Sequence, residues 1–443
     1  MPTLKAIERV VDLTDPTGNV IFNMSVEEAR SLVAAGDPQA VRRIDGHFAL
    51  VATAGVHVRM ARSIGRPLRY FIAKRSEGPA LIAADRIDTI HRYLSDAGLA
   101  DQFHPSYTRM VPAHYVTDVA LVGCPDPNPT YTRYFDPRRN NLPADVEAIG
   151  QAYIGALANE IAKWLRFRAS DGPIGVCFSG GIDSGSVFLV TYHVMRQLGM
   201  NPARLKAFTL TVDGGGADAT QARRFLDALG LGLFLETIDV PRSAINWRET
   251  VRIVEDYKPL DIQSAAMALA LCRGIRQRYP EWRYLLDGDG GDENLKDYPI
   301  EENPELTIRS VLNNRMLYQE GWGVEAIKHS LTYSGGLSRG YARTYAPAAC
   351  CGFDGFSPYT LPNVAEVAEA IPFIELTDWS HDRLYALKGE VVSRGVKAIT
   401  GLDMPVFPKR RFQHGAPDPR AFTELFPTQP AAYRRAYHAA YES

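Results

Sequence analysis

The sequence predicts an α/β protein in which a doubly wound parallel sheet, over residues 143–443, follows an α+β domain over residues 1–142. In the second part, short apolar runs typical of buried strands alternate with segments of helical periodicity. In the first part, short β-type runs dominate and are bounded by turn residues. The segment Gly123–Pro143 is rich in Pro, Asn and Asp, so it is interpreted as a linker with the domain boundary near Leu142.

The first domain is predicted to contain an antiparallel sheet and few helices. One helix is expected over Ser25–Ala35, because Ser25 and Glu28 form a capping-box pattern at its start. The predicted strands are Phe48–Val51, Val56–Met60, Leu68–Ile72 and Ala80–Ala83. This pattern indicates an α+β domain.

The second domain is predicted to open with a helix over Ala144–Phe167. The strands expected after it are Ile174–Phe178, Lys206–Val212, Leu233–Val240 and Trp282–Leu286, and the helices are Gly185–Leu198, Ala217–Leu229 and Ala265–Arg278. Alternation of strand and helix is typical of a parallel sheet covered on both faces. From about Glu301 the chain is predicted to be mostly helical.

The composition excludes several classes of protein. The chain has 443 residues, 46% of them hydrophobic, and its 49 Lys and Arg nearly balance 51 Asp and Glu. No basic run indicates a polyanion-binding face, and no apolar run reaches the roughly 18 residues of a membrane helix. The N-terminus lacks the apolar region of a signal peptide, and the five cysteines form no CxxC pair. We therefore expect a soluble, cytoplasmic protein that binds neither nucleic acid nor membrane.

The strongest functional signal is the segment Phe178–Ser184, which reads FSGGIDS and lies between a predicted strand and a helix. Gly180 and Gly181 let the backbone N–H groups approach an anion, and the helix N-terminus adds partial positive charge. Ser179 and Ser184 add hydroxyl donors. Asp183 fits such a site if Mg²⁺ lies between its carboxylate and a phosphate. Alone, the segment would also fit an ordinary Gly-Gly turn that caps a helix; no GxxxxGK[ST] loop is present.

A second glycine- and acid-rich loop, Leu285–Glu293, follows a later predicted strand. The carboxyl ends of parallel strands meet at one edge of a sheet, so this loop is expected to face the first one. Asp183 and Asp292 are predicted to hold one Mg²⁺ on the phosphates of a nucleotide, with Gly288 beside them. A surface turn is the alternative for this loop when it is taken alone.

The two loops together carry a resemblance. The segment SGGIDS resembles the SGGxDS pyrophosphate loop of ATP pyrophosphatases, and LLDGDGGDE resembles the family segment LSGEGADE. The chain as a whole resembles the asparagine synthetase and β-lactam synthetase family. The resemblance implies an adenine nucleotide α-hydrolase-like fold for residues 143–443. It also implies that ATP with Mg²⁺ adenylates a carboxylate, which is then joined to ammonia or to an amine.

Further site residues follow from the resemblance. Lys409, in Phe407–Gly415, falls on a family lysine suited to stabilising an oxyanion, although neighbouring arginines also fit a solvated basic tail. Lys388 falls on the lysine of a K-x-x-L-R stretch, and Leu210 lies on the strand whose backbone contacts adenine. Glu255 lies where the family has an acidic turn near the substrate. Asp289 stands where asparagine synthetases have Glu and β-lactam synthetases have Tyr, which leaves open how the amine is deprotonated.

The first domain is similar to the glutaminase domain of the same family, which implies an Ntn-hydrolase-like sandwich. Three segments carry this similarity: Ile44–Leu50 (LDGxFAF), Arg62–Tyr70 (DxxGxKPLYY) and Val111–Tyr115 (LPPGH). Glutamine hydrolysis in that domain uses an N-terminal cysteine. This sequence begins Met-Pro-Thr and its first cysteine is Cys124. We therefore expect no glutaminase activity.

Taken together, the sequence predicts an AMP-forming carbon–nitrogen ligase of specialised metabolism that joins a small-molecule carboxylate to an amine. Asparagine synthetase-type amidation with free ammonia, and an adenylating enzyme that modifies RNA, are the alternatives. A serine hydrolase is disfavoured because the GxSxG segment Gly336–Gly340 follows a predicted helix, Ala326–Leu331, instead of a strand. The substrate and the nature of the amine stay open, and so does assembly as a homodimer.

Overall fold

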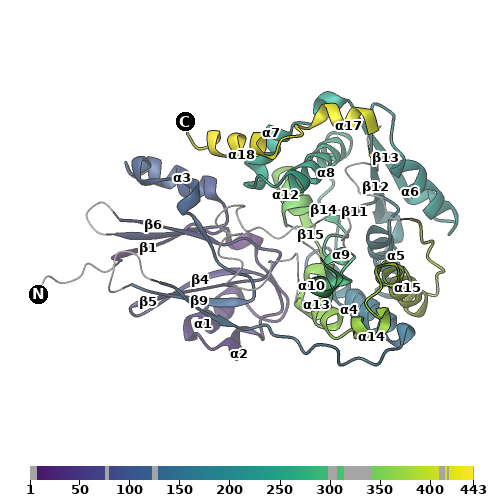
Figure 1. The fold of residues 1–443 in the computed structure, drawn as a ribbon, viewed down its shortest axis with the longest axis horizontal. Helices are drawn as coiled ribbons and strands as arrows, with labels where there is room; N and C mark the ends of the chain where they lie inside the picture. Colours follow the sequence, from purple (N-terminus) through teal and green to yellow (C-terminus); the bar gives the residue numbers. More distant parts are fainter. Residues whose placement is uncertain are drawn as a thin grey trace, which may run out of the picture. The chain divides into compact units, whose positions relative to one another are not determined.

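The computed structural model describes residues 7–74, 79–121, 128–297, 307–313, 341–408, 415–416 and 419–442. Cys124, Gly336–Gly340 and Lys409 lie outside the described residues. The described chain divides into two compact units (Figure 1). The first extends to Asp136 and includes Tyr341 and the C-terminal residues from Arg435; the second comprises the other described residues between Pro137 and Arg434.

The first unit contains two four-stranded sheets and a short strand pair. In one sheet, β1 (Arg9–Asp12) runs parallel to β7 (Ala80–Ala84), and β6 (Arg69–Ala73) and β8 (Arg109–Met110) continue it antiparallel. The other sheet is antiparallel throughout. Its order is β10 (Thr130–Arg133), β9 (Tyr115–Ala120), β5 (His57–Arg62) and β4 (Ala49–Ala54); the short pair is β2 (Val20–Ile21) with β3 (Gly46–His47).

The two sheets of the first unit share one apolar core, so they form the sandwich that the sequence predicts. Val51 and Met60 from one sheet pack in the same cluster as Tyr70 and Leu81 from the other. Helix α1 (Val26–Ala35) packs on β4, α3 (Ile87–Asp96) packs on β7, and α2 (Pro38–Val41) follows α1. The predicted capping box at the start of α1 is confirmed, since the side chains of Ser25 and Glu28 each accept from the other's backbone N–H.

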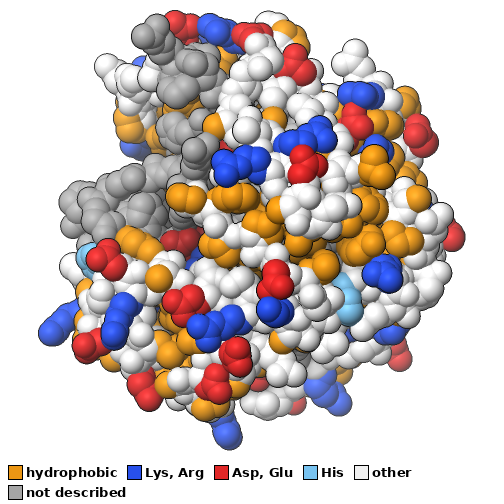
Figure 2. All heavy atoms as spheres, turned by 90° about the vertical axis from the view of Figure 1, so that its right-hand side faces the viewer, with side chains coloured by type: hydrophobic (Ala, Val, Ile, Leu, Met, Phe, Trp, Pro, Cys, Tyr) orange, Lys and Arg blue, Asp and Glu red, His pale blue; other side chains and the backbone are white. Residues whose placement is uncertain are grey.

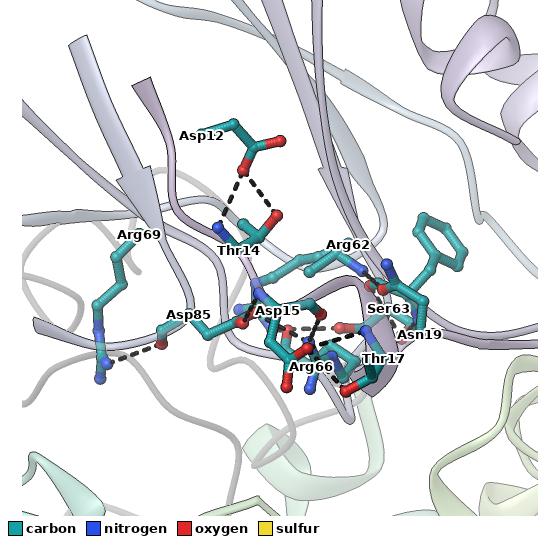
Figure 3. A network of polar contacts seen from close by, with 12 residues as sticks. Asp12, Thr14, Asp15, Thr17, Asn19, Arg62, Ser63, Arg66, Arg69 and Asp85 are labelled. Atoms are coloured by element: carbon teal, nitrogen blue, oxygen red, sulfur yellow. Dashed lines mark hydrogen bonds and ion pairs between the residues drawn. The ribbon is translucent and has the colours of Figure 1, made fainter. Parts of the chain in front are cut away.

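A polar network shown in Figure 3 secures the N-terminal segment of this unit. The Arg66 guanidinium donates to the Asp85 carboxylate at 3.0 Å and to the Asp15 carbonyl at 3.2 Å. Asp85 in turn accepts from the Asp15 backbone N–H at 2.7 Å. Arg62, which is buried, donates to the Val111 carbonyl at 2.5 Å. The arginines of the Arg62–Tyr70 segment therefore stabilise the fold by satisfying buried carbonyls and a carboxylate.

The second unit is built on a five-stranded sheet in which every neighbouring pair is parallel. Its order is β13 (Leu235–Val240), β12 (Leu205–Val212), β11 (Ile174–Cys177), β14 (Tyr284–Leu286) and β15 (Asp354–Phe356). The four strands that the sequence predicts are present. The edge strand β15 falls in the region predicted to be mostly helical; its three residues include Asp354 and Gly355, which carry no strand signal.

Helices cover both faces of this sheet (Figure 1). Helix α8 (Pro259–Arg278) packs on β12 and β13, and α5 (Ile182–Gln197) and α6 (Asp218–Asp227) lie on the other face. The prediction that α8 begins at Ala265 was wrong, because Pro259 opens its first turn. Further helices are α4 (Val146–Phe167), α7 (Trp247–Val254), α9 (Gly291–Asn294), α10 (Ile308–Asn313), α12 (Ala346–Cys350), α13 (Pro362–Glu369), α14 (Phe373–Thr377), α15 (His381–Thr400), α17 (Pro419–Leu425) and α18 (Pro430–Ala439).

The surface in one view carries charges of both signs. On the face shown in Figure 2, Lys and Arg side chains are interspersed with Asp and Glu and with apolar patches. No helix among the described residues has the length and apolarity needed to cross a lipid bilayer.

Helices α4 and α15 cross with their backbones in contact, which fixes the position of α15. A Cβ atom on Gly150 would lie 2.5 Å from the Val391 carbonyl oxygen and 2.8 Å from the Gly395 nitrogen. A Cβ atom on Gly395 would collide with the Gly150 carbonyl oxygen. Both positions therefore require glycine, because the obstructing atoms belong to the main chain and cannot rotate away.

Gly395→Ala is expected to destabilise the protein by about 1–3 kcal/mol, because the added methyl group forces the two helices apart. Gly155→Ala, on the facing helix α4, is the matched control, since its Cβ would meet only Ile399 Cδ1 at 3.7 Å. That change should stabilise by up to about 1 kcal/mol through helix propensity. Urea unfolding measures both; equal effects of the two substitutions would contradict the proposed crossing.

Candidate active site

In the second unit, the order in which the chain adds strands to the sheet reverses between β11 and β14. From β11 the chain proceeds to β12 and then β13 on one side, and it later returns to β14 on the other side. Loops that follow strands at such a switch point diverge and leave a crevice where α/β proteins bind ligands. The segments after β11 and β14 are the two loops singled out in the sequence, Phe178–Ser184 and Leu285–Glu293.

These two loops lie against each other. A Cβ atom on Gly288 would lie 2.8 Å from both the Asp183 carbonyl carbon and the Ser184 nitrogen. A Cβ atom on Gly291 would collide with the Asp183 carboxylate. The glycines of the second loop are therefore needed so that its backbone can pass beside the start of α5.

The first loop has the form expected of an anion cradle. Gly180 adopts a φ of 72°, and Gly181 is the N-cap of α5 without a side-chain cap. The Ser184 hydroxyl accepts from the Ser179 backbone N–H at 3.2 Å, and the Ser179 hydroxyl accepts from the Gly181 N–H at 3.3 Å. These bonds hold both hydroxyl groups at the N-terminus of a 16-residue helix, where an anion is favoured.

A buried lysine joins the two loops. The Lys388 ammonium, carried by α15, donates to Asp183 at 2.6 Å and also to Asp292, and it lies 3.4 Å from Asp297. Its side chain is 2% exposed, against 22% for Asp183 and 30% for Asp292. Burial alone would lower the pKa of Lys388, but the three carboxylates outweigh it and raise that pKa well above its ordinary value. The ammonium is therefore charged at neutral pH.

The two acids predicted to share Mg²⁺ thus converge on one cation. Among the described residues, no three His, Cys, Asp or Glu side chains are grouped so that they could hold a metal by themselves. Two carboxylates are nevertheless suitable for Mg²⁺, which completes its coordination with waters and substrate phosphates. The metal role of Asp183 and Asp292 stays a prediction that this arrangement fits.

Asp289 is a buried carboxyl group near both an arginine and other acids. Its backbone N–H donates to the Asp287 carboxylate at 3.0 Å, and its side chain accepts from Thr344. Burial raises the pKa of Asp289 to about 7, although the nearby Arg343 guanidinium lowers it. Arg343 is in turn held by Asp261, with Nε 3.1 Å from the carboxylate. Asp289 can therefore change its protonation state close to neutral pH.

The structure places the other predicted residues as follows. Leu210 lies on β12 beyond Phe208, where the pairing of β12 with β11 ends. Since Phe208 turns its carbonyl toward β11, alternation along the strand turns the backbone groups of Leu210 to the same side. Glu255 is buried at the C-cap of α7, with a left-handed φ of 57°. Its catalytic role, like that of Asp289, stays a prediction.

Four charged residues beside the site were not predicted from the sequence. Asp287 and Asp297 lie within and just after the second loop, so their spacing from Asp292 was a usable signal. Asp261, in the first turn of α8, and Arg343, before α12, are far apart in the sequence. No local pattern marks that pair, because only the packing of α8 and α12 brings the two side chains together.

A comparison with known families relates part of this unit to one of them. Residues 161–339 match the family model described as asparagine synthase. The chain contains an asparagine synthase domain. Both loops of the site lie inside the matched segment of this domain. The domain is therefore of a ligase type, and ATP is the co-substrate consistent with its family.

Two curated fungal relatives resemble parts of the chain. "Amidase chry2" of Gibberella zeae is 32% identical over 143 residues, covering 30% of this chain and 21% of the relative. "Amidase chyE" of Penicillium rubens is 25% identical over 206 residues, covering 44% of this chain and 29% of the relative. The chain thus spans less than a third of the length of these relatives.

Asp289→Asn is expected to change how stability depends on pH. The pKa of Asp289 is about 7 in the folded protein against an ordinary 3.8, so the folded state binds this proton more tightly than the unfolded state does. The resulting contribution to the free energy of unfolding is fully present below about pH 4 and is lost as pH rises to about 7. The variant does not titrate there, so it should gain stability relative to the wild type across this window and stay level above it. Urea unfolding from about pH 4 to pH 8 measures the difference; a constant difference would show that Asp289 titrates normally.

Proposed function

We propose that this protein is an ATP-dependent, AMP-forming ligase that adenylates a small-molecule carboxylate and joins it to an amine. The observation that carries the proposal is the convergence of Asp183 and Asp292, from the loops after β11 and β14, on a single cation at the switch point of the sheet. The asparagine synthase match over residues 161–339 supports the same reaction class.

In this proposal the phosphates of ATP lie on the loop from Ser179 to Ser184, whose hydroxyl groups and helix N-terminus face an anion. Asp183 and Asp292 would hold Mg²⁺, which would supply charge neutralisation for the pyrophosphate. Leu210 contributes backbone groups to the adenine, and Lys388 stays beside the phosphates. A carboxylate oxygen attacks the α-phosphorus, and pyrophosphate leaves.

The second half-reaction needs an amine in its neutral form. The pKa of Asp289, about 7, suits a group that accepts a proton from the ammonium form of the amine at neutral pH, so that the neutral amine can then attack. Thr344 orients the Asp289 side chain by a hydrogen bond, and Arg343 favours its charged form. We place Glu255 near the substrate as a second acid. Lys409 would stabilise the oxyanion that forms when the amine adds to the acyl-adenylate.

A substrate screen for nucleotide products tests the proposal directly. ATP incubated with panels of carboxylates and amines should yield AMP and pyrophosphate, and Asp183→Asn should lower that yield by about 100-fold or more. Release of ADP and phosphate instead of AMP would reject the mechanism. Comparing glutamine, ammonium and organic amines as donors tests whether the protein lacks glutaminase activity, and ammonium alone would favour asparagine-type amidation.

Lys409→Met separates the two half-reactions. If Lys409 acts on the tetrahedral intermediate, the variant should bind ATP with nearly wild-type affinity and lose amide formation by about 100-fold. Equilibrium binding of an ATP analogue and turnover with the substrates found above measure the two quantities. Wild-type turnover in this variant would remove Lys409 from the mechanism.

A further inference from the structure

A third carboxylate, Asp297, accompanies the two predicted metal ligands. Just after the C-cap of helix α9, Lys296 adopts the left-handed conformation, with φ of 56°, and the Asp297 N–H donates to the Asp292 carbonyl at 3.0 Å. This six-to-one bond is that of a Schellman motif, with lysine in the position usually taken by glycine. The motif turns the chain back, so that Asp297 lies beside Lys388 on the same side as Asp292.

The carboxylates around Lys388 outnumber its single positive charge. Asp183, Asp292 and Asp297 each lie within ion-pair distance of the Lys388 ammonium. These four groups by themselves sum to a charge of −2 (three negative charges and one positive), which suits an approaching divalent cation. Lys388 and Asp297 are the most deeply buried members, with side chains 2% and 9% exposed, whereas Asp183 and Asp292 are partly open to solvent.

This difference in burial assigns different tasks to the three acids. The two open carboxylates are reachable by a metal ion and a nucleotide. Asp297 is less exposed than either and lies 3.4 Å from an ammonium that has almost no exposure. An ammonium has three N–H donors, so Lys388 can engage one oxygen of each acid at once. If Asp183 and Asp292 turned to a metal, Lys388 would keep a buried partner only in Asp297.

We infer that Asp297 is a positioning residue, the permanent counter-ion that keeps Lys388 in place when Asp183 and Asp292 are taken up by the metal. This inference rests on the proposed function. Lys388 holds the two loops together where the metal would act. Once the metal is bound, Lys388 stays at the site on Asp297. Without Asp297, metal binding would leave a buried ammonium without a carboxylate, which is costly.

A double-mutant cycle on metal binding tests this role. Mn²⁺ is titrated into the full chain with saturating α,β-methylene-ATP, and bound metal is followed by electron paramagnetic resonance. Asp297→Asn should weaken Mn²⁺ binding in the presence of Lys388. In the Lys388→Met background the same change should have a roughly tenfold smaller effect, because the partner through which Asp297 acts is gone. The matched control is Asp403→Asn, which breaks an exposed ion pair of 2.7 Å with Lys397, a second lysine of helix α15. This change should leave Mn²⁺ binding unchanged.

The outcomes separate the possible roles. An effect of Asp297→Asn that is as large without Lys388 as with it would show that Asp297 acts only through its charge, and would overturn the inference. A wild-type chain that binds no Mn²⁺ with the analogue would overturn the proposed function, and this inference with it. Thermal unfolding adds a second readout: Asp297→Asn should reduce the rise in midpoint caused by Mn²⁺ and analogue more than it lowers the midpoint of the ligand-free protein. The reverse order would make Asp297 a partner for folding alone.

Discussion

The arrangement of the site depends on one ion cluster, in which the Lys388 ammonium links a loop after β11 to a loop after β14. These loops approach closely only because Gly288 and Gly291 leave room beside Asp183. Close approach of two carboxylates is unfavourable without a cation between them. The lysine therefore allows the two acids to be held in place before any ligand arrives, and the glycines allow the backbones to meet.

The local signals in the sequence were sufficient for four of the five strands of the parallel sheet and for the two loops of the site. Apolar strands, the Gly-Gly turn and a helix start are each encoded within a few neighbouring residues, so the Ser179–Ser184 loop could be located without coordinates. The start of α8 and the strand β15 could not be located in this way. Pro259 stands before the apolar run that marked the helix, and β15 is held by pairing with β14 more than by its own residues.

The same distinction applies to the site. Asp183, Asp292 and Lys388 were predicted from motif positions, and the structure places their side chains together. Arg343 and Asp261 were not predicted, because the two residues are far apart in the sequence and meet only in the folded structure. Asp297 lies close in sequence to the second loop, but its position depends on the left-handed residue before it. Sequence patterns expect glycine at such a position, and here the residue is Lys296. Charged residues that act in pairs across the fold are the part that sequence patterns describe least.

The contact of α4 with α15 at Gly150 and Gly395 has a mechanical consequence for the cluster. With main-chain atoms touching and no side chains between them, α15 has almost no freedom to slide or roll against α4. The backbone of Lys388 is therefore held in a fixed position. Adjustment of the ammonium during a catalytic cycle has to come from rotation about the four side-chain bonds of Lys388, over distances of an ångström or two, and not from travel of the helix.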